Sequence, residues 1–149
     1  MPPSSRYQLP ELFAEHRLRN PIPMDAPIAH ADADDVGRLA AAAFLEPERF
    51  DKEVIAWASE TISLGEFAKR VEAATGMSIE TETLDVDALK RSEDPLSAFK
   101  GITAEFLNSQ GYTLSDEQLS KGNSFGVRFT TVDEFIDKNK ARIVQLPSA

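Results

Sequence analysis

Cysteine is absent from the 149 residues of this chain. A disulfide, a thiolate zinc site and a cysteine nucleophile are therefore excluded. No apolar run approaches the ~20 residues that are needed to span a bilayer. The first six residues also lack the apolar segment of a secretory signal. We therefore expect a cytoplasmic protein that does not enter a membrane.

The seven glycines include no two that are separated by a single residue. A dinucleotide site needs G-x-G-x-x-G at a strand-to-helix turn, so that the backbone can approach the pyrophosphate. That fingerprint is absent, and so is a phosphate-binding P-loop. The sequence therefore predicts that no nicotinamide cofactor binds.

Two further catalytic motifs are missing. The Tyr-x-x-x-Lys pair of short-chain dehydrogenases fails because Glu11 follows Tyr7 and Asp116 follows Tyr112 at that spacing. That pair works because the lysine lowers the pKa of the phenol, and neither tyrosine has a lysine at this spacing. A G-x-S-x-G elbow for a serine hydrolase is also lacking.

Positive charge is scarce and scattered. The 25 acidic and 16 basic residues give a net charge of -9. A phosphate backbone or an anionic membrane surface is repelled by such a field, so nucleic-acid and membrane binding are not expected. The acidic excess favours solubility.

Hydrophobic residues make up 42% of the chain, enough for one domain with a core. Residues 1–26 form a proline-rich N-terminal segment, and residues 27–149 form the domain. Within the segment, Leu9, Phe13 and Arg17 share a face at helical spacing, which predicts a short helix over about 10–18 that lies on the surface.

The fold class that the pattern predicts is α/β. Three short strands are expected, at Pro27–His30, Glu53–Ala58 and Ser78–Leu84, with a brief fourth at Val127–Phe129 as an open alternative. Five or six helices are expected from their capping residues. They cover about 33–45, 63–76, 85–91, 94–111 and 132–140. A further helical turn is expected to begin at Ser115, followed by a loop over 121–126.

Two of these helices carry a distinct apolar face. In the helix over 33–45 that face is expected to pack on the sheet. Its members are Val36, Leu39, Ala40, Ala43 and Phe44. In the helix over 94–111 the face is expected to point inward. Its members are Leu96, Phe99, Ile102 and Phe106.

The strongest candidates for catalytic residues are His30, Asp32 and Asp34. Read as a calcium loop from Asp32, the segment lacks oxygen ligands at Val36 and Ala43, so no metal site is predicted. His30 with Asp32 or Asp34 is a candidate acid–base pair at the end of a strand. The competing interpretation is that the carboxylates cap a helix and the histidine is structural.

Four aromatic residues are candidates for a small-molecule pocket: Trp57, Phe99, Phe106 and Tyr112. Aromatic residues at core spacing are more often part of the hydrophobic core, and that interpretation also stays open.

Several segments resemble NmrA-like proteins, which are atypical relatives of the short-chain dehydrogenases and include isoflavone-reductase-like enzymes and redox-sensing regulators. Asp34–Phe44, followed by Pro47 and Phe50, is similar to a late strand-to-helix segment of that family. Glu53–Ala58 followed by Ser63–Gly76 is similar to the next strand and its helix.

The end of the chain strengthens this resemblance. Phe106–Tyr112 resembles the family's "phe-asn-x-x-gly-tyr" stretch, and Thr130–Phe135 resembles its closing "thr-x-glu-phe" helix. The likeness covers about Pro21 to Lys140. It implies a partial Rossmann-like fold, the C-terminal portion that binds substrate in the family.

The resemblance also implies what is missing. In the family, the glycine fingerprint, most of the parallel sheet and the catalytic lysine or tyrosine lie in an N-terminal half that has no counterpart here. None of the family's catalytic or cofactor residues maps onto a position of this sequence.

We therefore expect a truncated NmrA-like domain that binds a small molecule or a protein partner without a nicotinamide cofactor. The alternative is a cofactor-free isomerase, cyclase or lyase of secondary metabolism that uses an acid–base pocket around His30. A sheet edge and an apolar face left uncovered also predict a homodimer, or pairing with a separate chain.

Overall fold

Residues 10–144, which are the residues that the computed structural model describes, form four short strands and a set of helices. The strands are β1 (Arg17–Asn20), β2 (Pro27–His30), β3 (Glu60–Ser63) and β4 (Glu80–Thr83). The helices are α2 (Pro10–Glu15), α3 (Ala33–Leu45), α4 (Pro47–Phe50), α5 (Leu64–Thr75), α6 (Val86–Lys90), α7 (Pro95–Gln110), α8 (Asp116–Ser124) and α9 (Val132–Val144). The predicted α/β class is confirmed.

The strands form two separate pairs. β1 runs parallel to β4, and β2 runs antiparallel to β3 with Ile28 opposite Ile62. The strands at 27–30 and within 78–84 are confirmed, whereas β1 was not predicted.

The strand predicted over Glu53–Ala58 is wrong, because residues 53–58 form no strand. The strand that pairs with β2 is β3, which begins at Glu60. Residues 56 and 57 pack against α8 instead, where a β-carbon on Gly122 would lie 2.5 Å from the Ala56 carbonyl oxygen. Val127–Phe129 forms no strand either.

The proline-rich segment contributes to the core. Leu12 on α2 and Leu18 on β1 are 0% and 1% exposed, so residues 10–20 are not a surface wrap. The helix ends at Glu15 and not near Leu18, because His16 adopts a positive φ of 54° before β1 begins. Leu9, which the prediction placed on this helix, lies outside the described residues.

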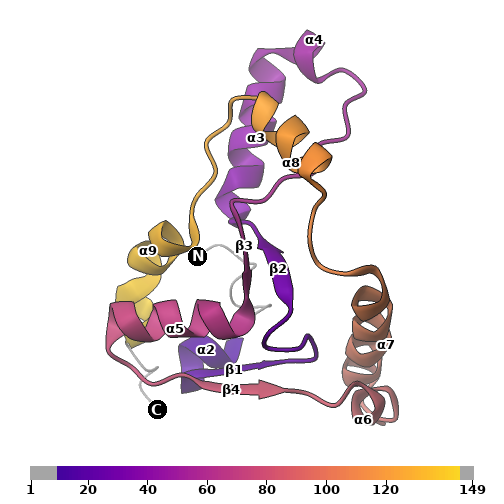
Figure 1. The fold of residues 1–149 in the computed structure, drawn as a ribbon, viewed down its shortest axis with the longest axis vertical. Helices are drawn as coiled ribbons and strands as arrows, with labels where there is room; N and C mark the ends of the chain where they lie inside the picture. Colours follow the sequence, from indigo (N-terminus) through magenta and orange to yellow (C-terminus); the bar gives the residue numbers. More distant parts are fainter. Residues whose placement is uncertain (1–9, 145–149) are drawn as a thin grey trace.

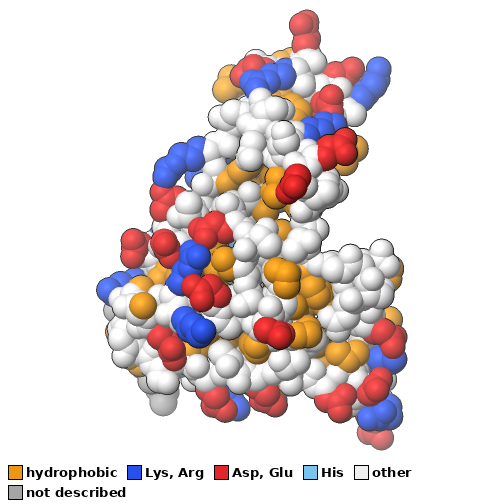
Figure 2. Space-filling view, viewed as in Figure 1, with side chains coloured by type: hydrophobic (Ala, Val, Ile, Leu, Met, Phe, Trp, Pro, Cys, Tyr) orange, Lys and Arg blue, Asp and Glu red, His pale blue; other side chains and the backbone are white. Residues whose placement is uncertain are grey.

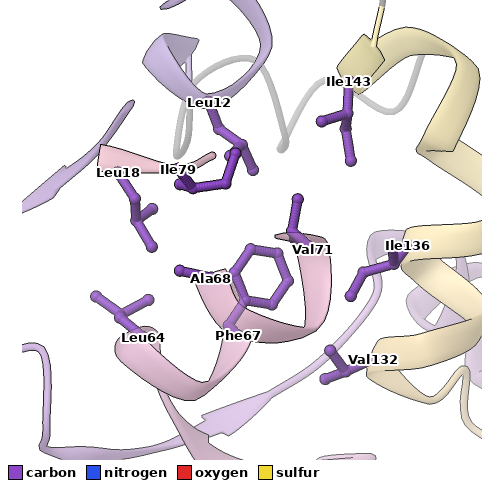
Figure 3. Close-up of a cluster of buried hydrophobic side chains, with 10 residues drawn as sticks. All are labelled: Leu12, Leu18, Leu64, Phe67, Ala68, Val71, Ile79, Val132, Ile136 and Ile143. Carbon is purple, nitrogen blue, oxygen red and sulfur yellow. The ribbon is translucent and has the colours of Figure 1, made fainter. Parts of the chain in front are cut away.

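The core gathers around α5 (Figure 3). Ser63 caps this helix by accepting a hydrogen bond from the Glu66 amide, and Gly76 ends it with a φ of 71°. The buried side chains of α5, Leu64, Phe67, Ala68 and Val71, recur at helical spacing. They meet buried residues of α2, β1 and α9, together with Ile79. The cluster comprises Leu12, Leu18, Leu64, Phe67, Ala68, Val71, Ile79, Val132, Ile136 and Ile143.

Helix α3 has the predicted bounds but not the predicted packing. Val36 and Phe44 on its apolar face are 58% and 85% exposed, so this face does not lie on a sheet. Its attachment is polar instead, through the fully buried carboxylate of Asp35. The oxygens of Asp35 accept hydrogen bonds from the backbone amide and the hydroxyl of Thr130, each at 3.0 Å.

Helix α7 begins after Asp94 and ends at Gly111, as predicted, but it buries the face opposite to the one predicted. Its buried residues are Gly101 and Ala104, which form a small face toward α6. A β-carbon on Gly101 would lie 2.7 Å from the Lys90 backbone nitrogen, so only glycine permits this approach. The predicted inward face is therefore outward: Leu96, Phe99, Ile102 and Phe106 are 58–69% exposed.

The last two helices begin as predicted and extend further. Ser115 and Gln118 form a capping box at α8, and Thr131 and Glu134 exchange the same bonds at α9. The loop predicted over 121–126 is wrong because α8 continues to Ser124. None of the helices within residues 10–144 is long and apolar enough to cross a membrane.

Three groups of elements are visible in Figure 1. The core lies around α5, α2, α9, β1 and β4. An arm of α3, α4 and α8 extends from it, and the α6–α7 hairpin lies on the side away from α9. The space-filling view shows a recess between the arm and this hairpin (Figure 2).

The Gly101 contact yields a test against a matched glycine. Gly101→Ala should lower the free energy of unfolding by about 1–3 kcal/mol, because the new methyl group meets backbone that cannot move aside freely. Gly37→Ala on α3 has no atom within 4 Å of the new β-carbon, and should raise it by up to ~1 kcal/mol through helix propensity. Urea unfolding of both variants measures the two effects. Stabilisation by both substitutions would contradict the close packing of α7 on α6.

Candidate functional site

Two of the three predicted acid–base residues meet at the start of α3. Asp32 is the N-cap and accepts a hydrogen bond of 2.9 Å from the Asp34 amide. Lys138 on α9 bonds to the carboxylate of Asp34, and its ammonium nitrogen lies 3.9 Å from Oδ2 of Asp32. The hydrogen bond and charge of Lys138 lower the pKa of Asp34, and Asp34 in turn raises the pKa of Lys138.

Asp32 is the more buried of the two carboxylates. Its side chain is 3% exposed, and among the described residues Oδ2 has no hydrogen-bond partner. Lys138 balances its charge from 3.9 Å. The other oxygen, Oδ1, caps the helix, as the capping interpretation of this segment predicts.

His30 lies away from these carboxylates, against the core. Its ring stacks on Phe67 with centroids 5.8 Å apart, and Nε2 donates a hydrogen bond of 3.1 Å to the Ile62 carbonyl oxygen. Burial lowers the pKa of His30, so the ring is neutral near pH 7. Within residues 10–144, the structure gives no hydrogen bond or ion pair between His30 and Asp32 or Asp34. Lys138 thus joins Asp32 and Asp34 but not His30, and an acid–base role for the three residues stays a prediction.

The four predicted aromatic residues are also distributed over several places. Trp57 stacks on Phe129 with centroids 5.0 Å apart. The Tyr112 hydroxyl donates to the side chain of Asn108, and its carbonyl oxygen accepts from the Ala29 amide at 2.8 Å. Phe99 and Phe106 lie on the outer face of α7. A pocket role for these four residues stays a prediction.

Two carboxylates that the sequence did not single out are structural anchors. Asp35 holds α3 to Thr130, with Arg38 as its counterion. Glu60 accepts from the Val132 amide at 2.9 Å and from Arg70 at 2.8 Å, which joins β3 to α9 and α5. Burial acts to raise the pKa of Glu60, but the bonds from Val132 and Arg70 outweigh it and lower that pKa. Thr130 and Val132, whose backbone amides bind these two carboxylates, lie 95 and 72 residues away along the chain, so no local pattern could have revealed these contacts.

Residues 127–130 separate two open pockets. One, of about 420 Å³, is bounded by the start of β3, by α8 and by Phe129. The other, of about 340 Å³, is lined by Arg38, Arg128, Phe129, Thr130, Glu134 and Lys138.

The cations of the second pocket are already paired. Arg38 bonds to Asp35, Arg128 to Glu134 and Lys138 to Asp34. In the part of the chain that is described, no group of three or more His, Asp or Glu side chains could hold a metal ion.

A clear departure from an ordinary surface is the outer face of α7, which we call the α7 stripe. It consists of Leu96, Phe99, Ile102 and Phe106. These residues recur at intervals of three and four, so they follow one face of the helix. Soluble proteins seldom expose two phenylalanines and two aliphatic side chains in a row, and such surfaces mark interaction sites.

Comparisons with known proteins agree on the fold. A model of the NmrA-like family matches residues 6–136. Among solved structures, a nucleoside-diphosphate-sugar epimerase from Staphylococcus aureus matches with a TM-score of 0.62 at 20% sequence identity. The match covers 91% of this chain and 48% of that one, so this chain spans about half of its length. It supports the partial Rossmann-like fold. None of the curated proteins matches the sequence.

The position of His30 predicts a pH-dependent contribution to stability. His30→Ala should lower the free energy of unfolding by about 1–3 kcal/mol at pH 7.5, because the Ile62 carbonyl oxygen loses its donor. The folded-state pKa lies below the ordinary 6.5. As the pH falls below that value the unfolded chain takes up the proton first, so the stabilisation present at higher pH is lost.

Urea unfolding of both proteins between pH 7.5 and pH 5 measures this. The difference in the free energy of unfolding between wild type and variant should shrink as the pH falls. A difference that grows at low pH would contradict a neutral, core-facing ring.

Proposed function

This chain belongs to the NmrA-like family, and from that premise we propose that it is a protein-binding domain that works without a nicotinamide cofactor. The observation that carries the proposal is the exposure of the α7 stripe, whose members are 58–69% exposed. Aromatic side chains contribute most to the energy of protein interfaces.

The rigidity of α7 supports this role. Its N-terminus is capped by Asp94, and Lys90 of α6 forms an ion pair of 2.5 Å with Glu105. Gly101 brings the two helices into close contact. The α7 stripe therefore lies on a helix that is held in place, so little conformational entropy is lost when a partner binds.

The two pockets support a small-molecule site less well. Ligand pockets are usually apolar with a few polar groups that fix orientation. The pocket near α9 instead has three cations that are each held by a carboxylate. A ligand would have to displace these ion pairs.

In the matched epimerase the corresponding region is part of a larger structure. In that protein the matched region makes up 48% of the chain, so it is joined there to about as much structure again. The α7 stripe is the surface on which we expect this domain to receive such a neighbour.

Site-specific photo-crosslinking tests the proposal. A photoreactive phenylalanine analogue at Phe106 should form covalent adducts with another polypeptide on irradiation in the producing cells. The control position is Asp137, exposed on α9 on the opposite side of the molecule (Figure 1). Gel analysis should show a shifted band only for position 106. Equal adducts from both positions, or none from position 106, would contradict docking on α7.

Titration with NADH and with NADPH tests the second half of the proposal. No heat of binding is expected, because the glycines needed to bring backbone near a pyrophosphate are absent. Isothermal calorimetry at up to millimolar cofactor is the measurement. A dissociation constant in the low micromolar range would show that the chain binds the cofactor by another route.

A further inference from the structure

We propose that the partner of the α7 stripe is α7 of a second copy of this chain, in an antiparallel pair around a two-fold axis. The inference rests on the proposed function and names the occupant of the same surface. Homodimers with two-fold symmetry are the commonest soluble oligomers, and such an interface must be complementary to itself.

The charge of α7 favours a second copy. The chain carries a net charge of -9, so most of its surface repels another copy. On α7 the only charged residues are Lys100 and Glu105, which cancel. Glu105 is also neutralised by Lys90 at 2.5 Å.

The spacing of the α7 stripe fits a two-fold axis. Phe99 and Phe106 are seven residues apart, which is close to two helical turns, so both side chains point to the same side. An axis that passes near Ile102 places Phe99 of one copy against Phe106 of the other, twice. The aromatic rings then form the two ends of the contact and the isoleucines its centre.

The area of the α7 stripe is sufficient for such a pair. An aromatic side chain can bury ~150–250 Å². On this scale, the exposed surface of the four stripe residues and of Leu107 is roughly 500 Å² per copy. Two copies therefore bury about 1,000 Å² of apolar surface, near the lower limit for a specific interface before any polar rim is added.

The first test is the mass in solution. Sedimentation velocity at micromolar concentration should give the wild-type chain twice its 16.4 kDa. Phe106→Asp should reduce the mass to that of one chain and weaken self-association at least 100-fold, because both copies bury a charge in the contact. Phe44→Asp is the control, since Phe44 is 85% exposed on α3. It should leave the dimer intact.

The second test uses the absence of cysteine. The Ile102→Cys variant has a single thiol, at position 102. Mild oxidation should convert most of this variant to a disulfide-linked dimer, which a non-reducing gel detects. Asp137→Cys on α9 should stay monomeric under the same conditions. This measurement does not depend on the folding of the Phe106 variant.

The outcomes separate the two proposals. A wild-type mass of one chain, or dissociation by Phe44→Asp but not by Phe106→Asp, would overturn the α7 pair. So would failure of Ile102→Cys to crosslink. If position 106 nevertheless captures a different protein in the photo-crosslinking experiment, the docking role of α7 stands and only its occupant is wrong.

Discussion

The contact between Gly101 and the backbone of Lys90 determines what this domain presents to its surroundings. Because a helix can turn only one face toward its neighbour, the approach at Gly101 and Ala104 fixes the rotation of α7 about its own axis. The opposite face then points outward, and that face carries Phe99 and Phe106. A side chain at position 101 would push α6 away and remove the constraint that holds the α7 stripe in place.

Polar anchors hold the remaining parts of the molecule together. The core around α5 is small, and the arm that contains α3 lies outside it. Asp35 attaches this arm through Thr130, while Glu60 joins β3 to the first turn of α9 and to Arg70. Asp35 is buried and Glu60 is partly buried, and ionisable side chains in such positions also occur in catalytic sites. Their hydrogen bonds are directed at backbone amides and counterions, as expected of groups that connect secondary-structure elements.

The sequence predicts the local elements well because their signals are local. The bounds of α3, the caps of α5 and α7, and the capping box at Ser115 follow from residues within four positions of each helix end. Strand β1 and the partner of β2 were missed, since they depend on pairing with residues far along the chain.

The candidate site was predicted only in part, for a related reason. Asp32 and Asp34 do lie together, but the partner that joins them is Lys138, more than a hundred residues away. For His30, local sequence gives the strand end but not the ring's direction toward Phe67. The apolar face of α7 was recognised from its helical spacing, but the prediction that it points inward is wrong. Its pattern contains no information on whether the cover comes from the same domain or from another chain.

Hydrogen exchange measured at two protein concentrations tests the central claim most directly. If α7 pairs with a second copy, amides within residues 95–110 should exchange more slowly at high concentration, where the dimer dominates, than after dilution. Amides of α3, within residues 33–45, should exchange at the same rate in both samples. Exchange in α7 that is independent of concentration, or protection that appears in α3 instead, would contradict the account.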